Sequence, residues 1–151
     1  MSRLALLLAL ALAPVPLAAQ AHPLVGEWSV TLAVGMRMEN DAETPIMATG
    51  TMSIVAQGDS LIATTKMPAP AGRPARPPSR MAAKSSSGAV TFVLTSQASI
   101  NMNGEMSTRT SVSTFVLTAN GNAMTGTMAR TVEGMDMAPA PTPVTGTRVT
   151  R

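Results

Sequence analysis

The segment over residues 26–38 alternates strictly between apolar residues and small or polar ones. The apolar series is Trp28, Val30, Leu32, Val34, Met36 and Met38, and the residues between them are Ser29, Thr31, Ala33, Gly35 and Arg37. Successive side chains on a β-strand point to opposite faces, so the pattern predicts a long strand with one apolar face and one solvated face. A chain that carries such a strand must bury its apolar face in a sheet structure.

The residues before this strand are typical of a secretory signal peptide. Arg3 precedes an apolar run over residues 4–17, and Ala19-Gln20-Ala21 has small residues at the spacing of a cleavage site. A membrane-spanning helix needs about 20 apolar residues, whereas this run is shorter and contains two prolines. We therefore predict a signal peptide over residues 1–21, cleaved just before His22 or slightly earlier, and a periplasmic or secreted location.

Residues 22–151 have the length of one domain with one core. The chain has no Cys, so packing must hold it together without disulfides, which for an exported protein favours a bacterial source. Aromatic residues make up 2% of the chain, and the 13 methionines provide bulk in their place. The formal net charge of +3 is mild, and no aromatic residues interleave with the basic ones, so nucleic acid is not an expected partner.

Six further segments have strand patterns and are separated by turn residues. They are residues 46–56, 61–67, 89–102, 105–118, 123–132 and 144–150. The best hairpin signals are Gln57-Gly58-Asp59-Ser60, Asn103-Gly104 and Asn120-Gly121. Because hairpin follows hairpin with no helical pattern between, we predict an all-β, up-and-down antiparallel meander that closes into a barrel of seven or eight strands. An eighth strand would come from a split at Gly35 or Ser96, or from residues 134–137.

Residues 68–88 are rich in Pro, Ala and Arg, and we predict that they form a flexible loop outside the sheet. This loop and its flank are basic, and no acidic residue occurs between residues 60 and 104. The basic residues are Lys66, Arg73, Arg76, Arg80 and Lys84. They are interpreted either as a solvated loop or as a contact with an anionic surface such as lipid headgroups.

The two ends of the domain resemble the lipocalins. Gly26-Glu27-Trp28 matches their Gly-x-Trp signature, and Thr145-Gly146-Thr147-Arg148 is similar to the closing Thr-x-Thr-Arg of small exported bacterial lipocalin-like β-barrel domains. The resemblance implies that Gly26, Trp28 and Arg148 close one end of the barrel, with Trp28 beneath Arg148 in a cation–π contact of about 0.5–2 kcal/mol. The chain is shorter than classical lipocalins and shows no C-terminal helix pattern, which counts against a deep ligand cavity.

The chemistry-bearing residues do not form a catalytic pattern. The single His, His22, lies at the predicted mature N-terminus, which is a poor place for a catalytic base. Most carboxylates fall in predicted turns or at strand ends, and nothing pairs two of them across a cleft. We therefore predict a protein that is not an enzyme and needs no cofactor.

The function that we predict is binding of a small apolar or amphipathic ligand by a monomeric exported protein. The residues that would line its pocket or fill its core are Val30, Leu32, Met36, Met38, Met52, Ile54, Phe92, Leu94, Met102, Met106, Met124 and Met128. Small barrels can instead be filled by their own side chains, so a structural or accessory protein is one alternative.

A Cu(I) site is the second alternative. Met36 and Met38 form one Met-x-Met pair, and Met135 and Met137 form another. Each pair would place two thioethers on one side of a strand, and thioethers are soft ligands that favour Cu(I). Core filling is the competing explanation for Met36 and Met38. It explains Met135 and Met137 least, because these two residues lie near a proline-rich stretch.

Overall fold

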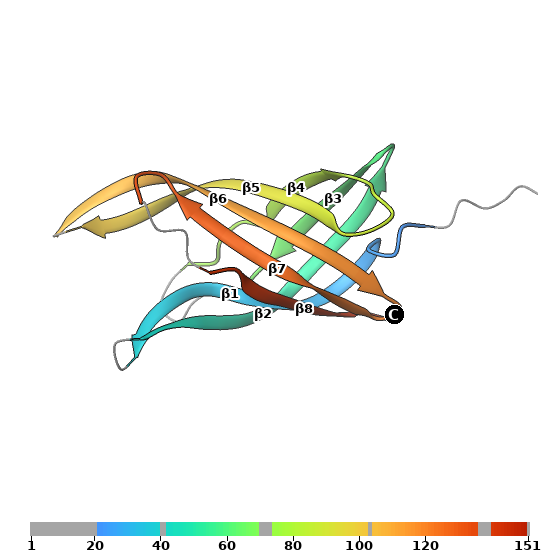
Figure 1. Ribbon diagram of the computed structural model, residues 1–151, viewed down its shortest axis with the longest axis horizontal. Coiled ribbons are helices and arrows are strands. Elements are labelled where there is room, and N and C mark those ends of the chain that lie inside the picture. The colour runs from blue at the N-terminus through green and yellow to red at the C-terminus, as the bar shows by residue number, and fades with distance from the viewer. Residues whose placement is uncertain (1–20, 40–41, 70–73, 103, 136–139, 151) are drawn as a thin grey trace, which may run out of the picture.

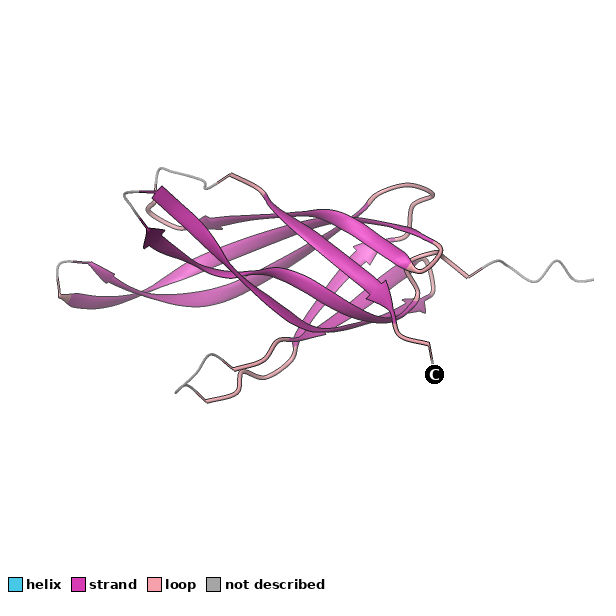
Figure 2. Ribbon diagram, turned by 90° about the horizontal axis from the view of Figure 1, so that it is seen from below, coloured by secondary structure: helices cyan, strands magenta, loops and turns pink. Residues whose placement is uncertain are grey.

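The structure is a computed structural model that describes residues 21–39, 42–69, 74–102, 104–135 and 140–150. All regular elements within these residues are strands (Figure 2). They are β1 Gly26–Glu39, β2 Ala42–Gln57, β3 Ser60–Lys66, β4 Ser79–Lys84, β5 Val90–Met102, β6 Glu105–Asn120, β7 Ala123–Val132 and β8 Thr142–Arg148. Each strand is antiparallel to the next, and β8 pairs with β1 (Figure 1). The predicted all-β, up-and-down closed barrel is confirmed.

The strand that the sequence analysis missed is β4, which differs from the positions predicted for an eighth strand. β4 lies inside residues 68–88, so the prediction of an unbroken loop there is wrong, and β1 and β5 are not split at Gly35 or Ser96. β4 pairs with β3 along its whole length and buries Met81 and Ala83. It forms because the prolines end at Pro78, directly before it, and the next residues alternate between the two faces.

The other strand predictions differ from the structure only at their ends. β2 begins at Ala42 instead of Ile46, and β8 spans Thr142–Arg148 instead of residues 144–150. The hairpin turns contain Gly58 and Gly121 at φ values of +62° and +59°, which glycine adopts without steric cost. The predicted signal peptide lies outside the described residues, except for Ala21.

A β-bulge interrupts the alternation of β1. The register against β2 shifts between Ala33 and Gly35, which leaves Val34 as an extra residue. A shift of one residue exchanges the faces of a strand, so the prediction that the alternation runs unbroken to Met38 is wrong. Met36, beyond the bulge, is 43% exposed. The side chain of Met38 is outside the described part of the chain.

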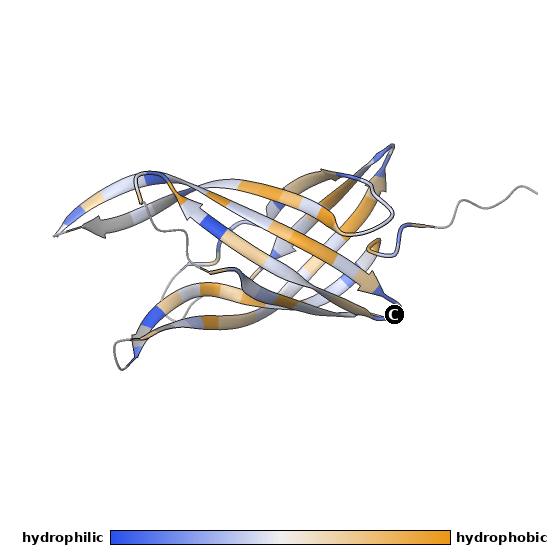
Figure 3. Cartoon of the chain, viewed as in Figure 1, coloured by the Kyte–Doolittle hydropathy of each residue, from blue (hydrophilic) through white to orange (hydrophobic). Residues whose placement is uncertain are grey.

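The core occupies the half of the barrel that contains the start of β1 and the end of β8. Figure 3 shows strongly hydrophobic stretches of β3, β5 and β6 gathered in this half. The buried cluster comprises Leu24, Trp28, Val30, Leu32, Met52, Ile54, Leu61, Ala63, Met81, Ala83, Val90, Phe92, Phe115, Leu117, Met124 and Val144. These side chains come from all eight strands and the residues just before β1, so this half is filled by the protein itself.

The opposite end opens into two hairpin arms (Figure 1, left). Among the described residues, β1 pairs with β8 only over residues 28–31, so the rest of β1 pairs with β2 alone. Likewise β6 pairs with β7 only from Ser111 onward, and its first residues pair with β5 alone. The β1–β2 and β5–β6 hairpins therefore project beyond the closed barrel.

Candidate functional site

A cluster around Trp28 closes the filled end of the barrel. The Trp28 side chain is fully buried, and its indole Nε1 donates a 2.8 Å hydrogen bond to the carbonyl of Leu24. The guanidinium carbon of Arg148 lies 4.2 Å from the centroid of the Trp28 ring. Arg148 also donates to the carbonyls of Val25 and Pro23, both at 2.6 Å. The Trp28–Arg148 contact is the one that the Gly-x-Trp resemblance implied.

Gly26 and His22 complete this closed end. Gly26 has a φ of +139°, a backbone conformation that favours glycine, and a Cβ atom there would displace the Arg148 guanidinium. His22 is half-buried, and its Nδ1 accepts a 3.2 Å hydrogen bond from the Leu24 amide. Its Nε2 therefore carries the proton and donates to the carbonyl of Ser86 at 2.8 Å. Both ring nitrogens are engaged, which gives His22 a structural place in the fold.

The predicted ligand-binding residues fall into three groups. Val30, Leu32, Met52, Ile54, Phe92 and Met124 are buried in the core of the filled half, and Leu94 and Met128 pack partly buried against it. Met36 and Met106 are 43% and 67% exposed toward the open end. Met38 and Met102 have side chains outside the described part of the chain. The filled core and the open end are therefore different environments, which the sequence had treated as one.

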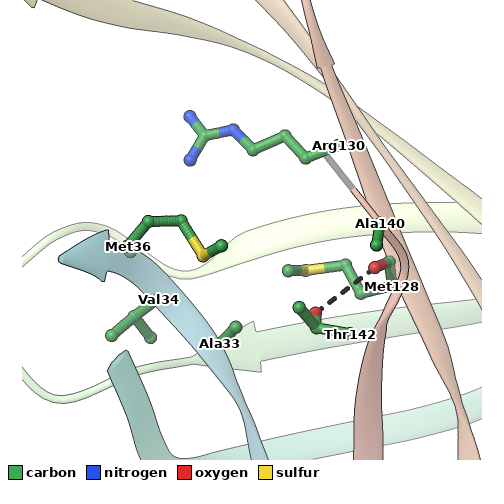
Figure 4. Close-up of a pocket in the computed structure, with 8 residues that line it drawn as sticks. Ala33, Val34, Met36, Met128, Arg130, Ala140 and Thr142 are labelled. Carbon is green, nitrogen blue, oxygen red and sulfur yellow. Dashed lines mark hydrogen bonds between the residues drawn. The ribbon is translucent and has the colours of Figure 1, made fainter. Parts of the chain in front are cut away.

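A pocket lies at the open end, where β1 diverges from β8 (Figure 4). Its volume is about 70 Å³. The lining residues are Ala33, Val34, Gly35 and Met36 of β1, Met128 and Arg130 of β7, Thr142 of β8, and Ala140 just before β8. The space opens because β1 pairs with β8 only over residues 28–31 and has its bulge just beyond them.

Arg130 is the charged residue of this pocket. Its Nε donates a 2.7 Å hydrogen bond to Oγ of Ser111, which is fully buried. In Figure 4 the guanidinium extends away from β7 toward the side on which Met36 lies. Within the described part of the chain, its terminal nitrogens have no hydrogen-bond acceptor and the one ion pair joins Arg37 and Glu39 instead. The pocket thus offers a fork of N–H donors beside apolar walls.

Buried hydroxyl groups occur on β3 and β6. Thr65, Ser111 and Ser113 are buried polar residues there. Thr65 Oγ1 and Ser107 Oγ are buried without a hydrogen-bond partner among the described residues. A buried polar atom without a partner costs about 1–3 kcal/mol. These two hydroxyls therefore oppose stability.

Sequence reasoning identified Met36 and Met128 of the pocket and missed the other lining residues. A signal for Arg130 was present, because it occupies the same face of β7 as Met124 and Met128. A charged residue on the apolar face of a strand is a reason to expect a pocket or a polar interior. No comparable signal marked Ala140 or Thr142, whose proximity to β1 depends on barrel closure.

The described residues contain no group of three or more His, Asp or Glu side chains that could hold a metal ion. Of the methionines proposed for copper, Met36 and Met135 are exposed, Met38 has an undescribed side chain, and Met137 lies outside the described residues. In the part of the chain that the structure describes, no helix has the length and hydrophobicity to cross a membrane.

The basic residues singled out in the sequence lie on or beside β3 and β4. Lys66, Arg76, Arg80 and Lys84 are all exposed, and Arg73 lies outside the described residues.

No protein-family model, curated protein or solved structure matches the chain. Its function has to be inferred from the sites themselves, since a barrel fold supports many functions.

Proposed function

We propose that this is an exported, non-catalytic binding protein for a small amphipathic ligand, held in the pocket at the open end of the barrel. The observation that carries the proposal is Arg130, whose terminal nitrogens have no acceptor among the described residues although they lie in a largely apolar pocket. The apolar part of the ligand packs against Met36 and Met128, and an anionic or acceptor group binds the guanidinium.

The apolar walls suit a ligand of variable shape. Met36 and Met128 come from β1 and β7, which do not pair with each other in the barrel. Methionine side chains are flexible and polarisable, so they adapt to different apolar groups. The pocket volume of about 70 Å³ is well below the roughly 300–1,000 Å³ of drug-sized ligand sites. The ligand is therefore small, or only one end of it enters.

The polar contact selects the ligand class. A guanidinium presents N–H donors in a planar fork that fits a carboxylate or phosphate with two parallel hydrogen bonds. The bond from Nε to Ser111 fixes one edge of the Arg130 group and leaves the other edge for a ligand. Short-chain carboxylates and similar amphiphiles match this combination of one anionic group and one apolar tail.

The filled half of the barrel favours a second candidate, a structural or accessory protein. Its core cluster is packed from all eight strands and leaves the ligand only the open end. Native mass spectrometry of protein isolated from the extracytoplasmic fraction of its own host separates the candidates. An adduct of a few hundred daltons supports the binding protein, the bare mass supports the filled barrel, and an added copper mass supports the methionine site.

Titration calorimetry with hexanoate and hexanol then tests the role of Arg130. We expect hexanoate to bind more tightly than hexanol. Arg130→Gln is expected to weaken hexanoate binding at least tenfold, since hydrogen bonds to charged groups contribute about 1.5–3 kcal/mol. Arg109→Gln, on the projecting part of β6 and outside the pocket lining, is the matched control. Equal hexanoate affinity in wild type and Arg130→Gln would contradict the proposed site.

A further inference from the structure

An apolar row crosses the outer surface of the barrel on β2, β3, β4 and β5, which lie side by side (Figure 1). The strand registers place Val55 opposite Ile62, Ile62 opposite Ala82, and Ala82 opposite Val93. The neighbours of these residues in sequence, namely Ile54, Leu61, Met81 and Phe92, point into the core. The side chains of the row therefore point away from the core. Val55 and Val93 are 52% and 49% exposed and Ala82 is exposed, whereas Ile62, between them, is 8% exposed.

Basic side chains flank this row on the same face. Arg80 and Lys84 lie two residues before and two residues after Ala82, so all three share the outer face of β4. Lys66 lies four residues after Ile62 on the outer face of β3. Each of these basic side chains is exposed. We call Val55, Ile62, Ala82 and Val93 together with Lys66, Arg80 and Lys84 the basic face.

Carboxylates are confined to the margins of this face. No acidic residue occurs between residues 60 and 104, which include all of β3, β4 and β5. The nearest in sequence, Asp59, lies in the β2–β3 turn, where its carbonyl accepts a 2.9 Å hydrogen bond from the Ser85 amide. Glu27 lies on β1 and accepts a hydrogen bond from Ser53 at 2.5 Å. The middle of the face therefore carries positive charge alone.

This combination points to a uniformly negative surface as the partner. The basic face offers one sign of charge around an apolar centre, and its electrostatic complement is a surface of uniform negative charge. Surface-bound proteins attach to membranes by the same two contributions, burial of apolar side chains and attraction of Lys and Arg to anionic lipids. The core packing of the barrel does not account for the row, because the row lies on the outside.

We propose that the basic face docks the barrel on the surface of a bilayer that contains anionic phospholipids. The valines of the row contact the interfacial region, and Lys66, Arg80 and Lys84 contact the headgroups. This interaction is separate from ligand binding in the Arg130 pocket, which lies between β1 and β7–β8 and shares no residue with the basic face.

Vesicle flotation tests this surface. We expect the protein to float with vesicles of three parts phosphatidylcholine and one part phosphatidylglycerol, with at least tenfold stronger partition than onto pure phosphatidylcholine in 0.1 M NaCl. Each basic residue near an anionic surface contributes about fivefold, so Arg80→Glu/Lys84→Glu is expected to lower partition at least tenfold. Val55→Ser/Val93→Ser is expected to lower the binding that survives 0.5 M NaCl.

Arg37→Glu/Arg109→Glu is the matched control, because it changes the net charge equally but lies on the two projecting hairpins. All of the substituted side chains are exposed, and a circular dichroism melt checks that each variant folds; Arg80→Gln/Lys84→Gln replaces any variant that does not. A control that lowers partition as much as the Arg80/Lys84 variant would overturn the proposal. Equal binding to both vesicle types would do the same.

Two further outcomes would overturn the proposal. Release of the protein from vesicles by 10 mM phosphate, beyond the effect of chloride at equal ionic strength, would indicate a site for a free anion and overturn docking on a bilayer. Failure to bind either kind of vesicle would overturn the proposal as well. Hexanoate affinity is measured independently of both, so this proposal and the ligand-binding proposal can fail separately.

Discussion

At the end of the barrel that contains Trp28, side chains fill the interior and backbone carbonyls take up the donors of Arg148. At the end that contains Arg130, strands diverge. Neither the buried hydroxyl of Ser107 nor the terminal nitrogens of the guanidinium have a hydrogen-bond partner among the described residues. The two arginines thus differ in one respect that matters for binding. Both terminal nitrogens of Arg148 donate hydrogen bonds to backbone carbonyls, whereas those of Arg130 have no acceptor among the described residues.

The comparison shows that a small barrel can separate the end that stabilises the fold from the end that is available for binding. Packing and satisfied hydrogen bonds at one end stabilise the fold, and this leaves the other end able to keep polar groups whose burial opposes stability. The variants below test whether stability is concentrated at the Trp28 end.

The largest effect is expected at Trp28. Trp28→Ala should lower the free energy of unfolding by about 3–5 kcal/mol, because it removes a fully buried ring and leaves a cavity. Met36→Ala, at the open end, should cost less than about 1 kcal/mol, since surface positions contribute little. Urea denaturation of both variants measures the contrast, and a loss below about 1 kcal/mol for Trp28→Ala would contradict the closing role of this residue.

A pair of glycines gives an intermediate effect. A Cβ atom at Gly126 would collide with the carbonyl oxygen of Val116, whereas a Cβ at Gly35 would meet only Cδ1 of Ile46 at an ordinary 3.7 Å. We expect Gly126→Ala to cost about 1–3 kcal/mol and Gly35→Ala to stay within about 0.5 kcal/mol of wild type. Thermal unfolding measures both, and similar melting temperatures for the two variants would argue against a tightly packed closed half.

The smallest effect has the opposite sign. Thr65→Val replaces a buried hydroxyl that has no partner among the described residues with a methyl group of similar size. We expect a gain of about 1 kcal/mol in the free energy of unfolding, because the desolvation cost of the hydroxyl disappears. Urea denaturation checks the sign, and a loss of stability would indicate that the hydroxyl is hydrogen-bonded in solution.

Much of the fold was predictable from the sequence, because alternating strands and Gly-containing turns are local signals. β4 was missed because Ser79–Lys84 is short, contains two alanines and follows a run of prolines. Its alternation between buried and exposed residues is therefore too brief to stand out in a segment whose composition predicts a loop. The pocket was harder to predict. It depends on the bulge near Gly35 and on the point where β1 parts from β8, and both are properties of strand pairing between distant segments.

The bond between Arg148 and Val25 joins positions 123 residues apart, and this separation has a consequence for how the barrel comes into being. Each strand from β2 to β8 pairs with the strand directly before it in sequence. The second partner of β1 is β8, so this pairing forms only when β8 has emerged. A chain that emerges with β1 first therefore passes through an open, curved sheet with two unpaired edges. Such edges are the usual templates for aggregation. Between the appearance of β1 and that of β8, the chain therefore exposes strand edges that closure of the barrel later removes.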